Sequence, residues 1–198
     1  MDKTIVIATN NKGKAKEFKS LFNDYGYKVK TLHDFPEIGE IPETGNTFAE
    51  NALQKASAIS RELNTIVLAD DSGLEVEALN NEPGIYSARY AGEHGNDQKN
   101  NEKLLKELKN VPKEERKANF HCTLVLVGPG RDPLFVEGNI NGFILFSSKG
   151  ENGFGYDPLF YIPSLEKSMG ELTEAEKNKI SHRAKAIKQL ENHLDKWL

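Results

Sequence analysis

The feature that most constrains the fold is a short run of β-branched and apolar residues, Thr4 to Ala8, which passes directly into the polar loop Thr9 to Lys14. After this loop, apolar residues recur at helical spacing, at Ala15, Phe18, Leu21 and Phe22. The pattern predicts a buried strand, a turn and a helix, in that order. Backbone N–H groups are free at the amino end of a helix, so this connection is a candidate anion site.

A second helix and strand follow. Thr47 and Glu50 have the spacing of a capping box, and an apolar stripe continues at Phe48, Ala52, Ala56, Ile59 and Leu63. The next apolar run, Ile66 to Ala69, reads as a strand that ends at the polar residues Asp70 to Gly73. Ligands of open α/β sheets bind beyond the carboxyl ends of strands, so these polar residues are candidate site residues.

The second half of the chain has a different pattern. Ala118 to Val127 alternates as a long strand, and Leu134 to Leu145 is predicted to return antiparallel to it. Further helices are expected at Asp97 to Leu108, after a cap formed by Thr173 with Glu176, and from Ser181 to the last residue. We therefore expect one α/β domain over residues 1–198, with a mixed sheet flanked by helices.

Composition excludes several classes of protein. The net charge of −4 argues against a general electrostatic grip on nucleic acid. A single cysteine, Cys122, cannot form an intrachain disulfide and is expected as buried filler in its strand. The N-terminal apolar run is far shorter than the ~20 residues of a membrane span. We therefore expect a cytoplasmic protein with neither nucleic acid nor a membrane as its partner.

The loop Thr9 to Lys14 offers a hydroxyl, amides, a glycine and two lysines, a set that suits phosphate. It lacks the full spacing of a P-loop, and an ordinary strand-to-helix connection explains it equally well.

Acidic residues form the second candidate feature. Asp70 and Asp71 follow a strand, and Glu43 lies in a turn before the capped helix. Mg²⁺ is commonly held by one or two carboxylates, with water and phosphate as the other ligands. Adjacent residues of an extended chain point to opposite sides, so at most one of the two aspartates is expected as a ligand in a given pocket. A solvated turn is the alternative for this segment, and a structural role for Asp70 stays open.

The third feature combines an aromatic turn with cations. In Gly153 to Pro158, glycines flank Phe154, which would let a planar ligand approach the backbone and stack on the ring. Lys177, His182 and Arg183 follow. Cations in the first turn of a helix oppose its dipole, an arrangement that favours a bound anion. A simple turn is the alternative.

Together these segments resemble the inosine triphosphate pyrophosphatase family, which hydrolyses noncanonical purine nucleoside triphosphates. Six segments carry the resemblance, in family order: Thr9 to Lys14, Glu43 to Ala52, Ala69 to Leu74, Pro83 to Tyr90, Gly153 to Pro158 and Ser181 to Ala186. The resemblance implies an elongated, twisted mixed sheet in two lobes with a central cleft, and a homodimer. It also implies Mg²⁺-assisted attack of water at the α-phosphorus of inosine, deoxyinosine and xanthosine triphosphates, which releases the monophosphate and pyrophosphate.

Family roles transfer residue by residue. The resemblance implies metal ligation by Glu43 and Asp71, with Asp71 also the proton acceptor. The substrate-binding residues that it implies are Thr9, Asn10, Asn11, Lys12, Gly13, Lys14, Ser72, Phe154, Gly155, Tyr156, Asp157, Lys177, His182 and Arg183. Relatives vary at Asn10 and Lys12, so these two receive no special role. The segment Pro83 to Tyr90 is expected to shape the cleft or the dimer contact.

Two other functions are compatible with the same segments. A non-hydrolytic purine nucleotide sensor would use the same cleft, although it has no need of carboxylates around a metal. A related pyrophosphatase could act on modified pyrimidine triphosphates. Released pyrophosphate separates the sensor from the enzymes, and a substrate panel separates the two enzymes.

Overall fold

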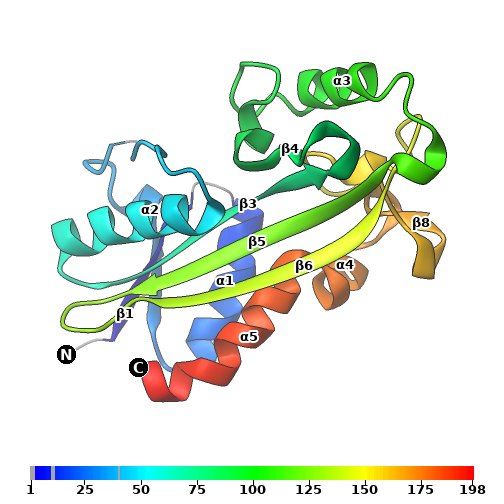
Figure 1. The fold of residues 1–198 in the computed structure, drawn as a ribbon. Coiled ribbons are helices and arrows are strands. Elements are labelled where there is room, and N and C mark those ends of the chain that lie inside the picture. Colours follow the sequence, from blue (N-terminus) through cyan, green and yellow to red (C-terminus); the bar gives the residue numbers. More distant parts are fainter. Residues whose placement is uncertain (1–2, 10–11, 40) are drawn as a thin grey trace. The chain divides into compact units, whose positions relative to one another are not determined.

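The computed structural model describes residues 3–9, 12–39 and 41–198. Within these ranges the strands form one mixed sheet in the order β2-β1-β3-β5-β6-β7-β8, with β4 paired to β3 (Figure 1). Strand β1 is parallel to β2 and β3, whereas β7 is antiparallel to β6 and β8. The predicted mixed α/β class is confirmed. The strands are β1 (Thr4–Ile7), β2 (Lys28–Thr31), β3 (Ile66–Val76), β4 (Glu82–Pro83), β5 (Lys117–Val127), β6 (Leu134–Ile144), β7 (Phe160–Ile162) and β8 (Lys167–Ser168).

The predicted helices are present, with their ends close to those expected. They are α1 (Lys12–Asp24), α2 (Phe48–Leu63), α3 (Asp97–Glu107), α4 (Glu174–Ile180) and α5 (His182–Trp197). One boundary was wrong: α1 already begins at Lys12, so Lys12 to Lys14 belong to its first turn and not to a loop.

The chain divides into two compact units, and strands β3, β5 and β6 and helix α5 contribute residues to both. Unit 1 comprises residues 1–71, 123–136 and 189–198. In unit 1, Val6 of β1 and Val67 of β3 pack with Ala56 and Ile59 of α2. Helix α2 covers one face of these strands and α1 the other (Figure 1).

Unit 2 comprises residues 72–122 and 137–188. Its core joins Leu74 of β3, Phe120 of β5 and Ile140 of β6 to Leu104 of α3. Phe160 also belongs to this core, with its ring centroid 4.5 Å from that of Phe120. The core is formed by residues that alternate along the strands, so the intervening side chains, such as Asn119, lie on the other face of the sheet.

The strand predicted over Ile66 to Ala69 continues to Val76, so Asp70 to Gly73 lie inside β3 and not in a turn. Tertiary pairing overrides the turn preference of Asp, Ser and Gly here, because Leu74 and Val76 beyond them are fully buried. Strand β1 ends earlier, at Ile7, whose partner in β3 is Leu68. Asp70 and Asp71 therefore still lie just beyond the carboxyl end of a parallel neighbour.

The capping box predicted for α2 is half correct. The Thr47 hydroxyl accepts from Glu50 N at 3.1 Å, as expected. The Glu50 carboxylate, however, accepts from the backbone N–H of Asn46 at 2.6 Å. The box predicted from Thr173 and Glu176 at the start of α4 is complete.

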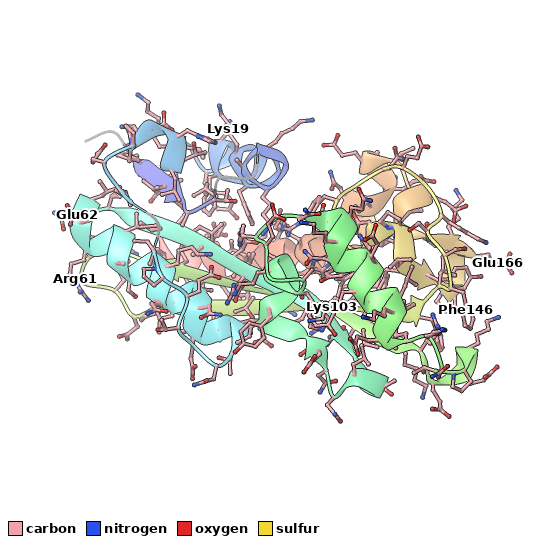
Figure 2. The ribbon with its side chains drawn as sticks, turned by 90° about the horizontal axis from the view of Figure 1, so that it is seen from above. Lys19, Arg61, Glu62, Lys103, Phe146 and Glu166 are labelled. Carbon is pink, nitrogen blue, oxygen red and sulfur yellow. The ribbon has the colours of Figure 1, made fainter. Side chains whose placement is uncertain are left out.

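Charged side chains cover much of the surface. The labelled Lys19, Arg61 and Glu166 point away from the ribbon in Figure 2, and all three are exposed. Among the residues that the structure describes, no helix combines the length and apolar character needed to cross a membrane.

Candidate active site

Asp70 and Asp71 contact different helices, as expected for adjacent residues of a strand. Asp70 is buried, and its carboxylate forms an ion pair with Lys14 of α1 at 2.5 Å. Asp71 accepts instead from the side-chain amide of Asn51 in α2, at 3.1 Å. The Asp70 carboxylate is therefore engaged by the first turn of α1, whereas the Asp71 carboxylate accepts a hydrogen bond from α2.

Asn51 links Asp71 to the segment that carries Glu43. The Asn51 side chain is fully buried, and its Oδ1 accepts from the backbone N–H of Gly45 at 2.8 Å while its Nδ2 donates to Asp71. A Cβ at Gly45 would approach Asn51 Oδ1 to 2.8 Å and Glu50 Cβ to 2.6 Å. The close approach of this segment to α2 thus requires glycine at position 45.

Lys55, one helical turn after Asn51, contacts the same group of acids. Its ammonium lies 2.5 Å from Glu43 Oε1 and donates to the backbone carbonyl of Asp70 at 3.3 Å. Residues four apart lie on one face of a helix, which brings Asn51 and Lys55 to the same side of α2. We call Glu43, Asn51, Lys55, Asp70 and Asp71 the acidic cluster.

Electrostatics within the acidic cluster perturb two groups. Burial, followed by the charge of Glu43, raises the pKa of Asp71 to about 7, and the Asn51 hydrogen bond and Lys55 only partly oppose this. Burial lowers the pKa of Lys55, but the charge of Asp70 and the contact with Glu43 outweigh burial, and the net shift is upward. Asp71 thus changes its charge near neutral pH while Lys55 stays an ammonium, a combination typical of a functional carboxylate.

A second group, in unit 2, combines an aromatic ring with cations. The Lys177 ammonium lies 2.5 Å from Asp157 Oδ2 and 4.4 Å from the ring centroid of Phe154. The guanidinium carbon of Arg183 is 5.8 Å from the same centroid, and Arg183 Nη2 lies 3.3 Å from the Ser72 hydroxyl. We call these five residues the aromatic–cation cluster. Phe154 is 43% exposed as a whole residue and so retains surface for a ligand.

The glycines beside Phe154 set the conformation of its turn. Gly153 has φ of +80°, and a Cβ there would collide with the Asp157 carboxylate. That carboxylate accepts from the backbone N–H of Phe154 at 2.9 Å. Asp157 therefore holds both the backbone of Phe154 and the Lys177 ammonium.

Two other predicted base-site residues are packed inside unit 2. His182 is buried, and its ring stacks on that of Phe120, with centroids 4.9 Å apart and planes at 16°. Tyr156 is also buried, and its hydroxyl donates to the backbone carbonyl of Ser87 at 2.8 Å. Both side chains pack against the protein in this structure.

The structure thus brings predicted residues together in two groups, Glu43 with Asp71 in unit 1 and Ser72, Phe154, Asp157, Lys177 and Arg183 in unit 2. Thr9 is buried next to β1. Asn10 and Asn11 lie outside the described residues, and for Lys12 and Gly13 the structure describes only their place in α1. Sequence reasoning assigned no role to Asn51 or Lys55, although their spacing of four residues on a predicted helix was a usable signal.

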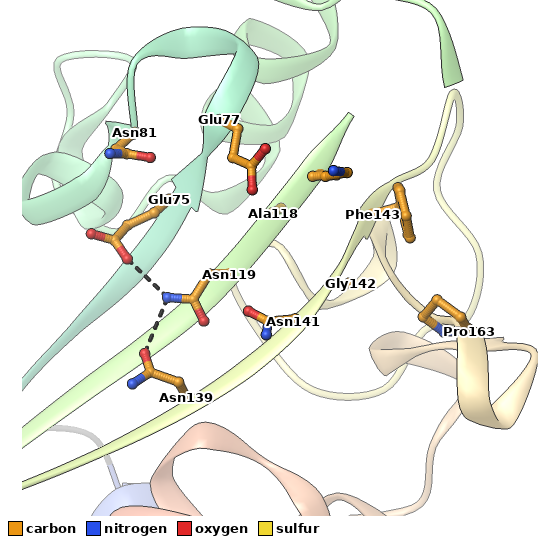
Figure 3. Close-up of a pocket in the computed structure, with 11 residues that line it drawn as sticks. Glu75, Glu77, Asn81, Ala118, Asn119, Asn139, Asn141, Gly142, Phe143 and Pro163 are labelled. Carbon is orange, nitrogen blue, oxygen red and sulfur yellow. Dashed lines mark hydrogen bonds between the residues drawn. The ribbon is translucent and has the colours of Figure 1, made fainter. Parts of the chain in front are cut away.

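A pocket of about 710 Å³ lies elsewhere in unit 2 (Figure 3). Its walls include Glu75, Asn119 and Asn139, and Asn119 donates to the other two side chains at 2.9 and 3.1 Å. Asn119 and Asn139 alternate with core residues of β5 and β6, so the pocket opens on the face of the sheet away from the core. None of the predicted site residues lines it within the described part of the chain.

Comparison with known proteins decides the family. Residues 5–193 match the Ham1 family. This chain belongs to the Ham1 family. The resemblance inferred from the six segments is confirmed by this match together with relatives of this chain that are named dITP/XTP pyrophosphatase. One from Listeria monocytogenes is 56% identical over 190 residues, which cover 96% of this chain and 94% of the relative. One from Bacillus cereus is 53% identical over 197 residues, with 98% and 96% covered.

A solved Ham1 structure has the same fold. The Staphylococcus aureus Ham1 protein superposes with a TM-score of 0.91 at 48% sequence identity, and the match covers 98% of both chains.

Proposed function

We propose that this Ham1 chain is a nucleoside triphosphate pyrophosphatase that hydrolyses inosine, deoxyinosine and xanthosine triphosphates to the monophosphate and pyrophosphate. The observation that carries the proposal is Asp71, a half-buried carboxylate that Asn51 holds within the acidic cluster and whose pKa is raised to about 7. A base with a pKa near the working pH is suited to accept a proton from water. The names of the relatives supply the substrate class.

Glu43 and Asp71 fit a divalent cation such as Mg²⁺. Repulsion from Glu43 contributes to the raised pKa of Asp71, so a cation between these hard oxygen donors would relieve it. The described residues hold no group of three or more His, Cys, Asp and Glu side chains placed for a metal. Two carboxylates suffice for Mg²⁺, which takes its other ligands from water and phosphate. When bound, Mg²⁺ would neutralise charge on the phosphates.

The protein groups have separate tasks in this reaction. Asp71 accepts a proton from the attacking water, and Asn51 fixes the orientation of its carboxylate. Lys14 and Lys55 bring positive charge to the acidic cluster for the triphosphate, and water attack at phosphorus needs such neutralisation and positioning more than covalent chemistry. None of these steps needs Cys122, which is fully buried.

The aromatic–cation cluster is proposed to bind the nucleotide base. Phe154 offers a ring for stacking, which by itself is tolerant of base identity. Arg183 supplies N–H donors, which match the 6-oxo group of hypoxanthine and xanthine and oppose the 6-amino group of adenine. An unpaired donor in a closed site can support about 10⁴-fold rejection. The homodimer and the cytoplasmic location are part of this proposal.

The deciding experiment is a panel of purine and pyrimidine nucleoside triphosphates with Mg²⁺, in which monophosphate and pyrophosphate are both measured. Inosine and xanthosine triphosphates should be cleaved far faster than ATP. Orthophosphate as the first product would refute cleavage between the α- and β-phosphates. Binding without release of pyrophosphate would indicate a sensor, and preference for a modified pyrimidine would indicate the related enzyme.

A further inference from the structure

Helix α3 holds both polar backbone atoms of Gly155, the residue after Phe154. The Asp97 carboxylate accepts from Gly155 N at 2.7 Å, and the Asn101 side-chain amide donates to Gly155 O at 2.8 Å. Asp97 and Asn101 are four residues apart and so share a face of α3. We call these two contacts the Gly155 clamp.

The clamp fixes the backbone conformation of Gly155, which packing around the residue does not restrict. Gly155 has φ of +62°, and a Cβ there would have no neighbour within 4 Å. Glycine populates many conformations, so the observed one has to be specified by other residues. The carboxylate contact is charge-assisted and therefore among the stronger hydrogen bonds.

A contribution to fold stability does not by itself explain why an asparagine stands at position 101. Its Oδ1 is buried and has no hydrogen-bond partner among the described residues, while its Nδ2 serves Gly155 O and Asp97 O. A buried acceptor without a partner is unfavourable, and an apolar residue at this position would avoid it. Buried polar atoms without a partner are expected where a residue contributes to a functional site.

The backbone on each side of the Phe154 Cα is fixed by a hydrogen bond. Asp157 accepts from Phe154 N, and the clamp fixes Gly155, so the two peptide groups that flank the Phe154 Cα each have a fixed partner. The clamp contacts only backbone atoms of Gly155, and Phe154 itself stays exposed. The orientation of the Phe154 ring thus depends on α3, an element outside the acidic and aromatic–cation clusters.

We propose that Asp97 and Asn101 are positioning residues for base recognition, which act by presenting Phe154 in its stacking orientation. The inference rests on the proposed function, because it assigns Phe154 to the purine. It separates base binding from phosphate binding: loss of the clamp weakens ligands that contain the base and spares ligands that consist of phosphate alone.

The test compares two ligands on the full chain with Mg²⁺, inosine monophosphate and inorganic pyrophosphate, by calorimetry. In Asp97→Ala combined with Asn101→Ala, the affinity for inosine monophosphate should fall at least about tenfold, as expected for lost hydrogen bonds to a positioned loop. Pyrophosphate affinity should stay within about twofold of wild type, a difference of about 0.4 kcal/mol. In turnover assays with inosine triphosphate, KM should rise more than kcat falls.

Two variants serve as controls. Asp97→Asn keeps an acceptor for Gly155 N and should bind inosine monophosphate more tightly than Asp97→Ala, although both lose the same charge. Gln98→Ala alters an exposed neighbour on α3 and should behave as wild type. This pair of Asp97 variants decides the question even if the double variant does not fold.

Two results would overturn the positioning role of the clamp while leaving the proposed function intact. One is an equal loss of affinity for inosine monophosphate and pyrophosphate, and the other is an unchanged affinity of Asp97→Ala for inosine monophosphate. A wild-type protein that releases no pyrophosphate from inosine triphosphate would overturn both.

Discussion

Asp70 and Asp71 are identical side chains with different surroundings, and their partners assign their roles. Lys14 neutralises Asp70, so a structural role suits this residue, which the sequence left open between metal ligand and support. Asp71 accepts a hydrogen bond from the neutral amide of Asn51. Burial and the negative charge of Glu43 raise the pKa of Asp71 to about 7. In the metal-free protein, Asp71 is therefore expected to change its charge near neutral pH.

Replacement of Asp71 by Asn should abolish most turnover while keeping the fold. The amide preserves shape and can still accept from Asn51, but it cannot take a proton from water. Loss of a general base typically lowers the rate by about 10²–10⁴-fold. Release of pyrophosphate from inosine triphosphate at saturating Mg²⁺ measures the effect, and a variant with more than half the wild-type rate would contradict the role of Asp71.

The same substitution should stabilise the metal-free protein at high pH. The pKa of Asp71 is raised on folding, so its favourable contribution is complete below the ordinary value of about 4 and is lost as pH rises through about 7. The stability of Asp71→Asn relative to wild type should therefore increase between pH 5 and pH 8. The expected gain is about 1–3 kcal/mol in the free energy of unfolding.

Urea unfolding in the presence of a chelator, at both pH values, measures this difference. Glu77→Gln, which removes an exposed carboxylate in unit 2, serves as the charge control. A relative stability of Asp71→Asn that stays constant between pH 5 and pH 8 would mean that Asp71 is not the perturbed group.

At the scale of elements, the acidic cluster depends on the stability of helix α2, because α2 carries both Asn51 and Lys55. Thr47→Ala removes the side chain that caps this helix. The expected loss is about 1 kcal/mol, and the melting temperature should fall by about 2–4 °C for a chain of this size. Thr47→Ser keeps the hydroxyl and should remain close to wild type, so equal melting temperatures for the two variants would exclude the cap.

Elements with long periodic patterns could be predicted from the sequence, as could the short strand β1 and the capped helix α4, whereas the two-residue strands could not. Helix α2 and the pair β5 and β6 were recognised because their apolar positions repeat over ten residues or more. Strands β4 and β8 have two residues each, too few to show a period. Asp70 to Gly73 were misplaced in a turn, because their turn preference is local and the pairing that overrides it is not.

The candidate site was predictable only in part. Glu43, Asp70 and Asp71 were candidates from their positions in the sequence, and the family resemblance selected Glu43 and Asp71. The structure brings these two together with Lys55. Nothing local to Asp97 or Asn101 indicates a contact with Gly155, because 58 and 54 residues separate the partners along the chain.

At the scale of the whole molecule, the two compact units should unfold together. Strands β3, β5 and β6 and helix α5 each contribute to both units, so neither unit can lose its strands alone. Differential scanning calorimetry should give one transition, with equal calorimetric and van't Hoff enthalpies. Two resolved transitions, or a van't Hoff enthalpy well below the calorimetric one, would show that the units are independent domains.

The register of β3 gives the two aspartates their separate partners, because successive side chains of a strand point to opposite faces of the sheet. One residue inserted or deleted between Leu68 and Asp70 would move every later side chain of the strand to the opposite face. The two carboxylates would then exchange helices: the second aspartate would face α1, and the first would face α2. For protein evolution, a three-base insertion at this place is therefore a larger event than most substitutions, because it would move the proposed catalytic base to the other face of the strand without changing its chemistry.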